Sequence, residues 1–261
     1  MPTAGDLNSI AILNASTAIA VGSGGNILRS TDSGQTWTKI ESPTMETLNA
    51  VAAVSDGSAV AVGWHGTIIG TTDGGKTWTS RFNSQEPSLN FEAVDLTKDG
   101  TGMAVSSSGR IFKTTDTYNW LPQVLPDAGQ KLFAVDLFDD NNAFTAGNIE
   151  EEKAYQVGGK TVILKTETGG QVWGYGPRNL NADPLAVRYV DRLNAVIVGW
   201  EGLILITGDG GGSWSPIVSP TSQALRAIAM ADATTIVAVG NGQTIISSRN
   251  GGDTWNKIRG S

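Results

Sequence analysis

A short phrase ending in tryptophan recurs six times along this chain of 261 residues, and no other feature limits the fold as strongly. Its copies read RSTDSGQTW, GTTDGGKTW, KTTDTYNW, KTETGGQVW, ITGDGGGSW and SSRNGGDTW. A period this regular indicates a repeat architecture in which each repeat is one supersecondary unit. The copies end 41, 42, 53, 41 and 41 residues apart, at Trp37, Trp78, Trp120, Trp173, Trp214 and Trp255.

Each phrase follows three short apolar runs, which in the second repeat are LNAVAAV, SAVAVGW and GTIIGTT. The runs are too short for helices and are rich in Val, Ile, Thr and Ala, a composition typical of strands joined by hairpins. With the strand that follows the phrase, each repeat holds four strands, the content of one propeller blade. The sequence therefore predicts an all-β fold, a six-bladed β-propeller with four antiparallel strands per blade.

The repeat also predicts the limits of the blades. We expect a single domain over residues 1–261, in which the two termini do not share a closing strand. The phrase should form the turn between the third and fourth strands of each blade. The predicted blades span residues 7–44, 48–88, 91–130, 132–184, 185–222 and 225–261.

Turn chemistry explains why the phrase is repeated. An aspartate can accept N–H groups of its own turn, the glycines supply positive φ, and the tryptophan anchors the following strand between sheets. We therefore interpret the phrase as structural rather than catalytic. The third copy is one residue short, and the fourth has Thr168 beside Glu167 in place of aspartate. The remaining copies carry the turn-forming residue at Asp32, Asp73, Asp116 (the short copy), Asp209 and Asn250.

Composition and charge exclude several kinds of site and partner. The formal charge of −7 argues against nucleic acid and anionic membranes as partners, since both bind clustered Lys and Arg. Without cysteine there is no disulfide or thiolate site, and His65 is the single histidine, which excludes multi-histidine metal sites. No apolar run reaches the length of a membrane span. We expect a soluble chain with no cofactor, and the sequence does not indicate its compartment.

Two tryptophans lie outside the phrase, at Trp64 and Trp200 in the turns GWHG and GWEG between the second and third strands. Propellers commonly bind ligands on the face that carries these turns, and exposed tryptophans are frequent binding anchors. We interpret Trp64, His65, Trp200 and Glu201 as candidate partner-binding residues. The alternative is that each tryptophan only covers the end of its sheet.

The fourth repeat carries an insertion over residues 148–158, on the same predicted face as the two tryptophans. Insertions in repeat proteins tend to fall on the binding face. The insertion adds candidate contacts at Glu150, Glu151, Glu152 and Tyr155, although a solvated flap is an equally available interpretation.

Asp95 and Asp136 occupy matching positions in the first strands of the third and fourth repeats. Two neighbouring carboxylates near a channel are the requirement of a glycosidase, a shared-proton pair or a hard-cation site. Alternatively, the two aspartates are hydrated residues that line the channel, or they accept hydrogen bonds from backbone N–H groups.

The phrase S/T-x-D-x-G-x-T-W resembles the Asp-box of the bacterial neuraminidase type of repeat, and the resemblance covers the whole chain. With the lead-in GGNILRSTDSGQTW and the strand pattern AVAVGWHGTI, the repeats are most similar to the photosystem II assembly and stability factor family. That resemblance implies seven blades, whereas this chain has six repeats. It also implies a basic patch that binds the reaction-centre protein, here a candidate patch of Arg29, Lys113 and Lys165.

Three hypotheses for function remain open. The first is a non-catalytic scaffold that binds a protein partner through the loops at the channel mouth and the insertion. The second is a carbohydrate-binding or glycosidase-related propeller, because sialidases and two-propeller endoglucanases also resemble this chain in their Asp-boxes. The sialidase arginine motif and long pocket-forming loops are absent, so a glycan-binding role is the stronger form of this hypothesis. The third is a virion or cell-surface structural module.

Overall fold

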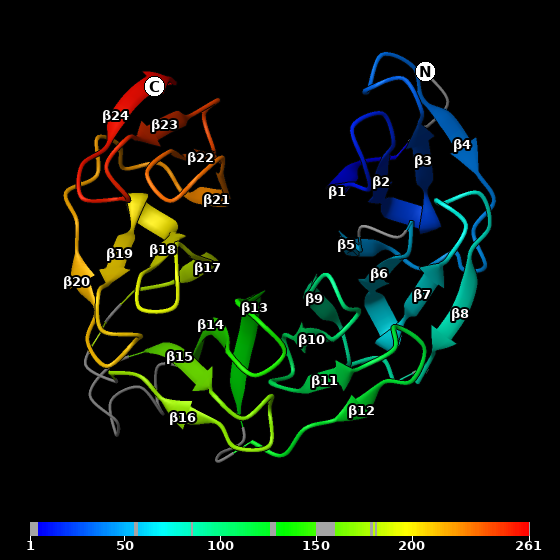
Figure 1. The fold of residues 1–261 in the computed structure, drawn as a ribbon, viewed down its shortest axis with the longest axis horizontal. Coiled ribbons are helices and arrows are strands. Elements are labelled where there is room, and N and C mark those ends of the chain that lie inside the picture. The colour runs from blue at the N-terminus through cyan, green and yellow to red at the C-terminus, as the bar shows by residue number, and fades with distance from the viewer. Residues whose placement is uncertain are drawn as a thin grey trace. The chain divides into compact units, whose positions relative to one another are not determined.

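The computed structural model describes residues 5–54, 57–84, 86–125, 129–149, 160–177, 180 and 182–260. The chain divides into two compact units, Met1–Val124 and Leu125–Ser261. Each unit contains three antiparallel sheets of four strands (Figure 1). Six such sheets confirm the predicted fold class, a six-bladed β-propeller with four strands per blade.

The first unit holds blades 1 to 3, and each blade uses four strands that are consecutive in sequence. Blade 1 contains β1 (Leu7–Ile12), β2 (Ala18–Gly22), β3 (Ile27–Ser30) and β4 (Thr38–Ile40). Blade 2 contains β5 (Leu48–Ala53), β6 (Ala59–Gly63), β7 (Ile68–Thr71) and β8 (Thr79–Phe82). Blade 3 contains β9 (Phe91–Leu96), β10 (Gly102–Ser106), β11 (Ile111–Thr114) and β12 (Leu121–Pro122).

The second unit holds blades 4 to 6 in the same order of strands. Blade 4 contains β13 (Gln130–Leu137), β14 (Ala143–Ile149), β15 (Thr161–Thr166) and β16 (Gly174–Tyr175). Blade 5 contains β17 (Pro184–Tyr189), β18 (Ala195–Gly199), β19 (Ile204–Thr207) and β20 (Ser215–Pro216). Blade 6 contains β21 (Leu225–Met230), β22 (Ile236–Gly240), β23 (Ile245–Ser248) and β24 (Asn256–Arg259).

The first strand of the chain belongs to the first blade. β1 pairs with β2, and the last sheet is made of β21 to β24, so no strand of the described chain is shared between the two ends. In the fourth blade β13 begins at Gln130, two residues before the approximate limit expected from the repeat. Its extra residues Gln130 and Lys131 pair with Ile149 and Asn148, so the described part of this hairpin is longer than in the other blades.

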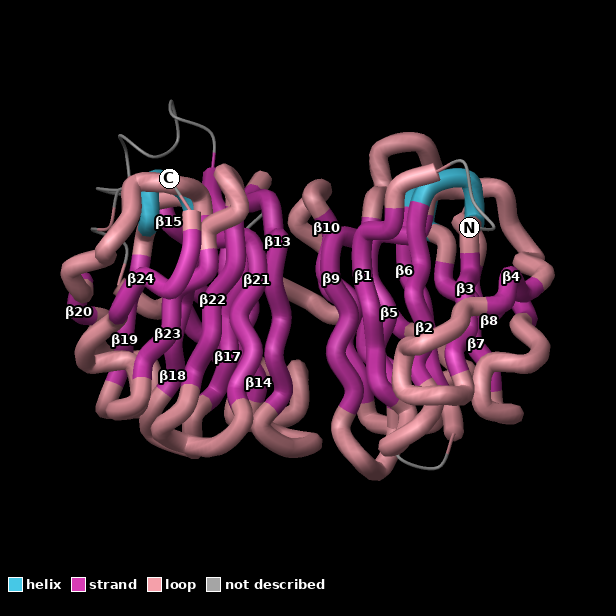
Figure 2. Tube along the Cα trace, turned by 90° about the horizontal axis from the view of Figure 1, so that it is seen from above, coloured by secondary structure: helices cyan, strands magenta, loops and turns pink. Residues whose placement is uncertain are grey.

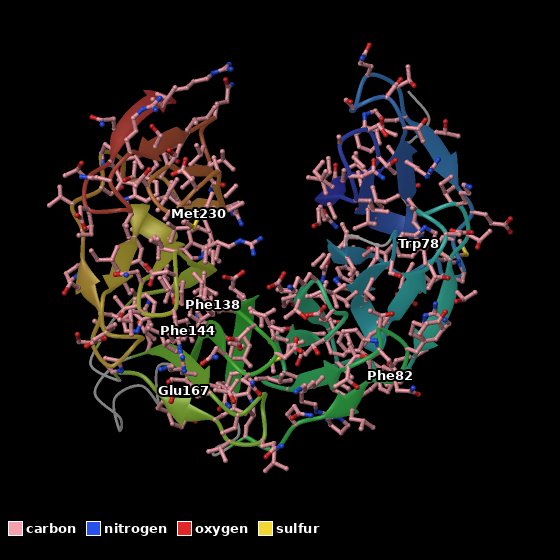
Figure 3. The ribbon with its side chains drawn as sticks, viewed as in Figure 1. Trp78, Phe82, Phe138, Phe144, Glu167 and Met230 are labelled. Atoms are coloured by element: carbon pink, nitrogen blue, oxygen red, sulfur yellow. The ribbon has the colours of Figure 1, made fainter. Side chains whose placement is uncertain are left out.

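The apolar runs become strands because both of their faces are covered. The second strands β2, β6, β10 and β18 are buried along their whole length, which explains continuous runs such as AVAVG and AVIVG. Within each unit, Trp78, Trp120, Trp214 and Trp255 pack against the preceding blade. Trp78 clusters with Ile19 of blade 1, and the Trp214 ring meets Phe144 of blade 4 edge-on at 5.5 Å. Figure 3 labels Trp78 and Phe144 within their units.

The phrase also joins neighbouring blades through its second glycine. A Cβ on Gly75 of blade 2 would lie 2.3 Å from the Ile19 side chain of blade 1. A Cβ on Gly211 of blade 5 would lie 2.6 Å from the Phe144 ring of blade 4. Both glycines have positive φ, so this position requires glycine for its conformation and for its close packing.

In each unit the turns separate to the two ends of the strands (Figure 2). The phrase meets the turn between the first and second strands, as where Gly74 N donates to Gly57 O at 3.0 Å. The turns between the second and third strands lie at the other end. Three of them form 3-10 turns, drawn in cyan: η1 (Ser23–Gly25), η2 (Trp64–Gly66) and η3 (Trp200–Gly202).

Candidate functional site

Trp64 and Trp200 occupy the same turn in blades 2 and 5. The preceding residues, Gly63 and Gly199, have nearly identical backbone angles (φ −169° and ψ −150°, φ −170° and ψ −153°). Each tryptophan amide donates to the carbonyl that precedes its blade, Trp64 to Thr47 O and Trp200 to Asp183 O, both at 3.0 Å. Each indole is 46% exposed, which is unusual for the largest apolar side chain.

The turn itself does not require tryptophan. The equivalent amide in blade 1 belongs to Ser23, in blade 3 to Ser107 and in blade 6 to Asn241, and each makes the same bond at 2.9–3.0 Å. Three blades thus build this turn with a small polar side chain. The indoles of Trp64 and Trp200 are therefore additions to the fold, placed on its surface.

The residue after each tryptophan has a strained backbone. His65 has φ 53° and Glu201 has φ 56°, in the left-handed region that favours glycine, and blade 1 has Gly24 at the matching position. A non-glycine residue there costs of order 1 kcal/mol, and such strain concentrates at functional sites. Both candidate turns thus keep a charged or titratable residue where glycine would fit more easily.

Polar side chains surround Trp64 in the first unit. His65 Nδ1 lies 2.9 Å from Glu46 Oε2, and the His65 amide donates to Asn90 Oδ1 at 3.2 Å. The His65 ring meets the Trp64 ring at 6.5 Å between centroids. These contacts hold the turn between the links that precede blades 2 and 3.

Trp200 in the second unit has a richer environment. The Arg226 guanidinium lies 5.2 Å from the Trp200 ring centroid, within the range of a cation–π contact, and Arg226 Nε donates to Asn241 Oδ1 at 2.7 Å. A cavity of about 200 Å³ lies beside this tryptophan, lined by Lys160, Ala182, Asp183, Trp200, Glu201 and Leu203. Trp200 thus combines an exposed aromatic ring with an adjacent small polar cavity.

Four residues of this environment were not found as site residues from the sequence. Lys160 pairs with Asp183 at 2.5 Å, and Asn148 Nδ2 donates to the other Asp183 oxygen at 2.9 Å. Arg226 comes from the first strand of the next blade. No periodic signal marks these residues, because they meet Trp200 only through the packing of neighbouring blades.

The insertion contributes Asn148 and Ile149 to the end of β14. Its candidate contacts Glu150, Glu151, Glu152 and Tyr155 lie outside the described residues. The described chain resumes at Lys160, which lines the cavity beside Trp200.

The two candidate channel acids fall in different units. Asp95 lies in β9 of the first unit, and Asp136 lies in β13 of the second. Asp136 is 4% exposed and accepts from the Arg188 guanidinium and, at 2.6 Å, from the Tyr189 amide. The Asp136 carboxylate therefore binds groups of the neighbouring blade 5.

The candidate basic patch consists of residues in the third strands of blades 1, 3 and 4. Arg29 Nε donates to Gly74 O, in the phrase of the next blade, at 2.6 Å. Lys165 pairs with Glu167 at 2.7 Å, and its ammonium would lie 3.3 Å from a Cβ on Gly210 of the next blade. Lys113 occupies the matching position in β11.

The phrase aspartates accept hydrogen bonds from their own turns. Asp32 accepts from Thr36 Oγ1 at 2.5 Å, from Thr36 N at 2.9 Å and from Ser30 Oγ at 2.8 Å. These bonds, the Thr36 hydroxyl foremost, lower the pKa of Asp32 to about 2. Asp73 and Asp116 have the same pKa of about 2, and the pKa of Asp209 is also lowered by the hydroxyl of its Ser213.

In the altered phrases, a neutral hydroxyl or amide oxygen replaces the carboxylate as the acceptor of the turn's hydrogen bond. Thr168 Oγ1 accepts from Val172 N at 2.9 Å, and Asn250 Oδ1 accepts from Thr254 N at 3.0 Å. The tryptophans that follow, Trp120, Trp173 and Trp255, are at most 7% exposed, whereas Trp37 is partly buried. The hairpin thus tolerates loss of the carboxylate.

The described residues contain no group of three or more His, Asp or Glu side chains arranged to hold a metal ion. Within the same ranges, no helix has the length and apolar character needed to cross a membrane.

Comparison with known proteins bears on the whole chain. The family model described as photosynthesis system II assembly factor YCF48 matches residues 3–124 and 126–259. The comparison with curated proteins gave no match.

Solved structures resemble the chain in fold. A YCF48 structure described as bound to a D1 peptide is 18% identical, with a TM-score of 0.75 over 98% of this chain and 82% of that one. YCF48 from Cyanidioschyzon merolae is 19% identical, with a TM-score of 0.74 over 98% and 86%. A GH74 xyloglucanase from Xanthomonas campestris is 14% identical, with a TM-score of 0.73 over 95% of this chain and 45% of that one. At these identities the likeness shows the fold alone.

Proposed function

Because the chain belongs to the family of photosynthesis system II assembly factor YCF48, we propose that it is a non-catalytic scaffold that binds a protein partner. The partner is an extended peptide segment of the kind represented by the D1 peptide in the solved relative. Binding takes place on the ends of the sheets that carry the Trp64 and Trp200 turns, together with the blade 4 insertion.

The observation that carries this proposal is the presence of Trp64 and Trp200 in turns that other blades form without tryptophan. Three blades form the same turn with Ser23, Ser107 and Asn241, so folding does not account for two half-exposed indoles. Tryptophan and arginine are enriched among residues that dominate interface energies. Trp200 combines both with the Arg226 contact and the adjacent cavity of about 200 Å³.

The acids considered for catalysis support a scaffold better than an enzyme. Asp136 is committed to Arg188 and to the Tyr189 amide, and a general acid or nucleophile needs a carboxylate that faces a substrate. We expect no turnover of xyloglucan or sialoside substrates. Turnover that disappears in Asp136→Asn would contradict the non-catalytic assignment.

The test is binding of a fluorescently labelled D1 peptide to the full chain, measured by anisotropy. Trp64→Ser and Trp200→Ser each introduce the side chain that blades 1 and 3 already use in this turn, so the backbone is preserved. We expect each to weaken binding at least tenfold, since removal of an interface anchor costs about 2 kcal/mol or more. A third variant, with residues 150–158 replaced by a Gly-Ser turn, tests the insertion.

Leu121→Ser is the matched control, because Leu121 is 66% exposed and lies in β12, away from these turns. It should bind the peptide as the unmodified chain does. Equal affinity of the unmodified chain and both tryptophan variants would overturn the proposed surface. Absence of peptide binding to the unmodified chain would overturn the proposed partner.

A further inference from the structure

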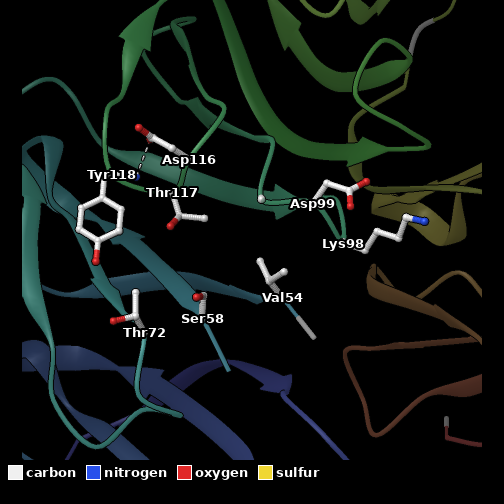
Figure 4. A pocket seen from close by; sticks show the side chains of 9 residues that line it. Val54, Ser58, Thr72, Lys98, Asp99, Asp116, Thr117 and Tyr118 are labelled. Carbon is white, nitrogen blue, oxygen red and sulfur yellow. Dashed lines mark hydrogen bonds between the residues drawn. The ribbon is translucent and has the colours of Figure 1, made fainter. Parts of the chain in front are cut away.

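A second cavity lies in the first unit, at the opposite end of the sheets from the Trp64 turn. It has a volume of about 320 Å³ and opens between the phrases of blades 2 and 3 (Figure 4). Small-molecule sites begin at about 300 Å³, so this cavity has the size for a single small ring. The side chains that matter for its chemistry are Ser58, Thr72, Lys98, Asp99, Thr117 and Tyr118.

The cavity lies where the sequence departs from the repeat. Blade 2 has Gly70 where blade 1 has Arg29, and the Arg81 side chain packs against Gly70 instead. The phrase of blade 3 is also one residue short, with Thr117 and Tyr118 in place of glycines. The cavity thus lies where blades 2 and 3 differ from the other repeats.

Neighbouring groups hold Tyr118 in place. The Arg81 guanidinium lies over the Tyr118 ring, 3.6 Å from its centroid, and occupies the space above Gly70. The Tyr118 amide donates to Asp116 Oδ1 at 2.9 Å. Arg81 does not line the cavity, whereas Tyr118 does and is 45% exposed, so the ring is fixed by Arg81 and presents its remaining surface to the cavity.

Asp116 belongs to the structure of the phrase rather than to the ligand site. Its Oδ1 also accepts from Asn119 N at 2.8 Å, and its Oδ2 accepts from Asn119 Nδ2 at 2.7 Å. These bonds, the one from the Asn119 backbone amide foremost, lower the pKa of Asp116 to about 2. The carboxylate therefore stays ionised and bonded within its turn. The charges offered to a ligand are those of Lys98 and Asp99, which are opposite in sign.

The wall chemistry selects a class of ligand. Figure 4 shows Tyr118 and Thr72 on one side of the cavity, Lys98 and Asp99 on the other, and Ser58 between them. The hydroxyls of Thr72, Thr117 and Tyr118, one aromatic ring and a balanced pair of charges complement a neutral molecule with several hydroxyls and an apolar C–H face. We propose that this cavity binds a neutral sugar, with one ring against Tyr118.

The experiment is saturation-transfer NMR on the full chain with glucose, galactose, mannose, xylose and cellobiose. At least one sugar should receive saturation, and its affinity should fall tenfold or more in Tyr118→Ala. Thr72→Arg is a second variant, because Thr72 is exposed and a long side chain there fills the cavity without removing the tyrosine. Tyr175→Ala, in β16 of the second unit, is the matched control and should leave binding unchanged.

Undiminished sugar binding in both Tyr118→Ala and Thr72→Arg would overturn the proposal. So would saturation of glycine or acetate with none of any sugar, since the cavity would then recognise charge. Absence of transfer to all five sugars at tens of millimolar would also overturn it. The peptide test uses the opposite end of the sheets, so either proposal can fail while the other stands.

Discussion

Arg188 of blade 5 donates to the buried carboxylate of Asp136 in blade 4, and so joins the first strands of two adjacent blades. The neighbouring Tyr189 amide donates to the second oxygen of the same carboxylate at 2.6 Å. A charge buried in this way is tolerated because it is paired and hydrogen-bonded.

Removing the guanidinium should therefore destabilise the second unit. We expect Arg188→Ala to lower the free energy of unfolding by about 2–3 kcal/mol, since a buried carboxylate loses a charged partner. Urea unfolding measures the change. The exposed Arg192 of the same blade is the control, and Arg192→Ala should stay within about 0.5 kcal/mol. Equal effects of the two variants would contradict a role for the inter-blade pair.

The phrase aspartates should make the free energy of unfolding depend on pH. The folded pKa of Asp32 is about 2, below its ordinary value of 3.8, so the native state favours the ionised form. Its contribution is complete above pH 4 and is lost as the pH falls through about 2. The stability difference between the unmodified chain and Asp32→Asn should accordingly shrink between pH 6 and pH 2. Parallel unfolding curves at all pH values would contradict this.

Restoring the aspartate to the altered phrase of blade 4 should stabilise the fold. Thr168 offers a neutral hydroxyl where Asp209 offers a charged carboxylate bonded to both the amide and the hydroxyl of Ser213. Thr168→Asp combined with Val172→Thr should raise the free energy of unfolding by about 1 kcal/mol, because charged hydrogen bonds exceed neutral ones. Val172→Thr alone is the control and should have little effect. A destabilised double variant would show that blade 4 does not use the common turn.

Replacing two adjacent glycines of one phrase by alanine should lower the free energy of unfolding by clearly different amounts. Gly75→Ala meets both positive φ and the Ile19 side chain at 2.3 Å, and should cost about 2–4 kcal/mol. Gly74→Ala has positive φ but no atom nearer than 3.7 Å, and should cost about 1 kcal/mol. Thermal and urea unfolding of the two variants measure the difference. Similar costs would mean that conformation alone, and not packing on blade 1, fixes the second glycine.

The exposed tryptophans should be dispensable for folding. Trp64→Ser and Trp200→Ser should each change the free energy of unfolding by less than about 1 kcal/mol, because Ser23 and Ser107 support the same turn. If either tryptophan instead covers its sheet as core, its removal should cost about 3 kcal/mol or more. Urea unfolding decides between the two interpretations.

The fold class was predictable because the phrase carries its own local chemistry. Each aspartate, glycine and tryptophan acts within one hairpin or against the adjacent blade, so a 41-residue window contains almost all of the signal. The family resemblance rests on the same residues, and the family model confirms it. The start of β13 at Gln130 was not predictable, because it depends on pairing with the lengthened β14 across the insertion.

The candidate sites were predictable only in part. Trp64 and Trp200 stand out because they break the periodic placement of tryptophan. The Arg188–Asp136 pair joins residues 52 positions apart, and no sequence pattern links them. The position of Tyr118 beside its cavity depends on Arg81 of β8, which packs against Gly70 and lies over the Tyr118 ring, a combination that only packing reveals.

The second glycine of the phrase docks on the preceding blade at Gly75, Gly211 and Gly252, and this docking has an evolutionary consequence. In blades 1 and 2, the contact side chain Ile19 comes from a second strand and the glycine that fits against it, Gly75, comes from the next phrase. A repeat that is copied as a whole carries both partners of such a contact, whereas a change within the phrase must be compensated in the blade before it.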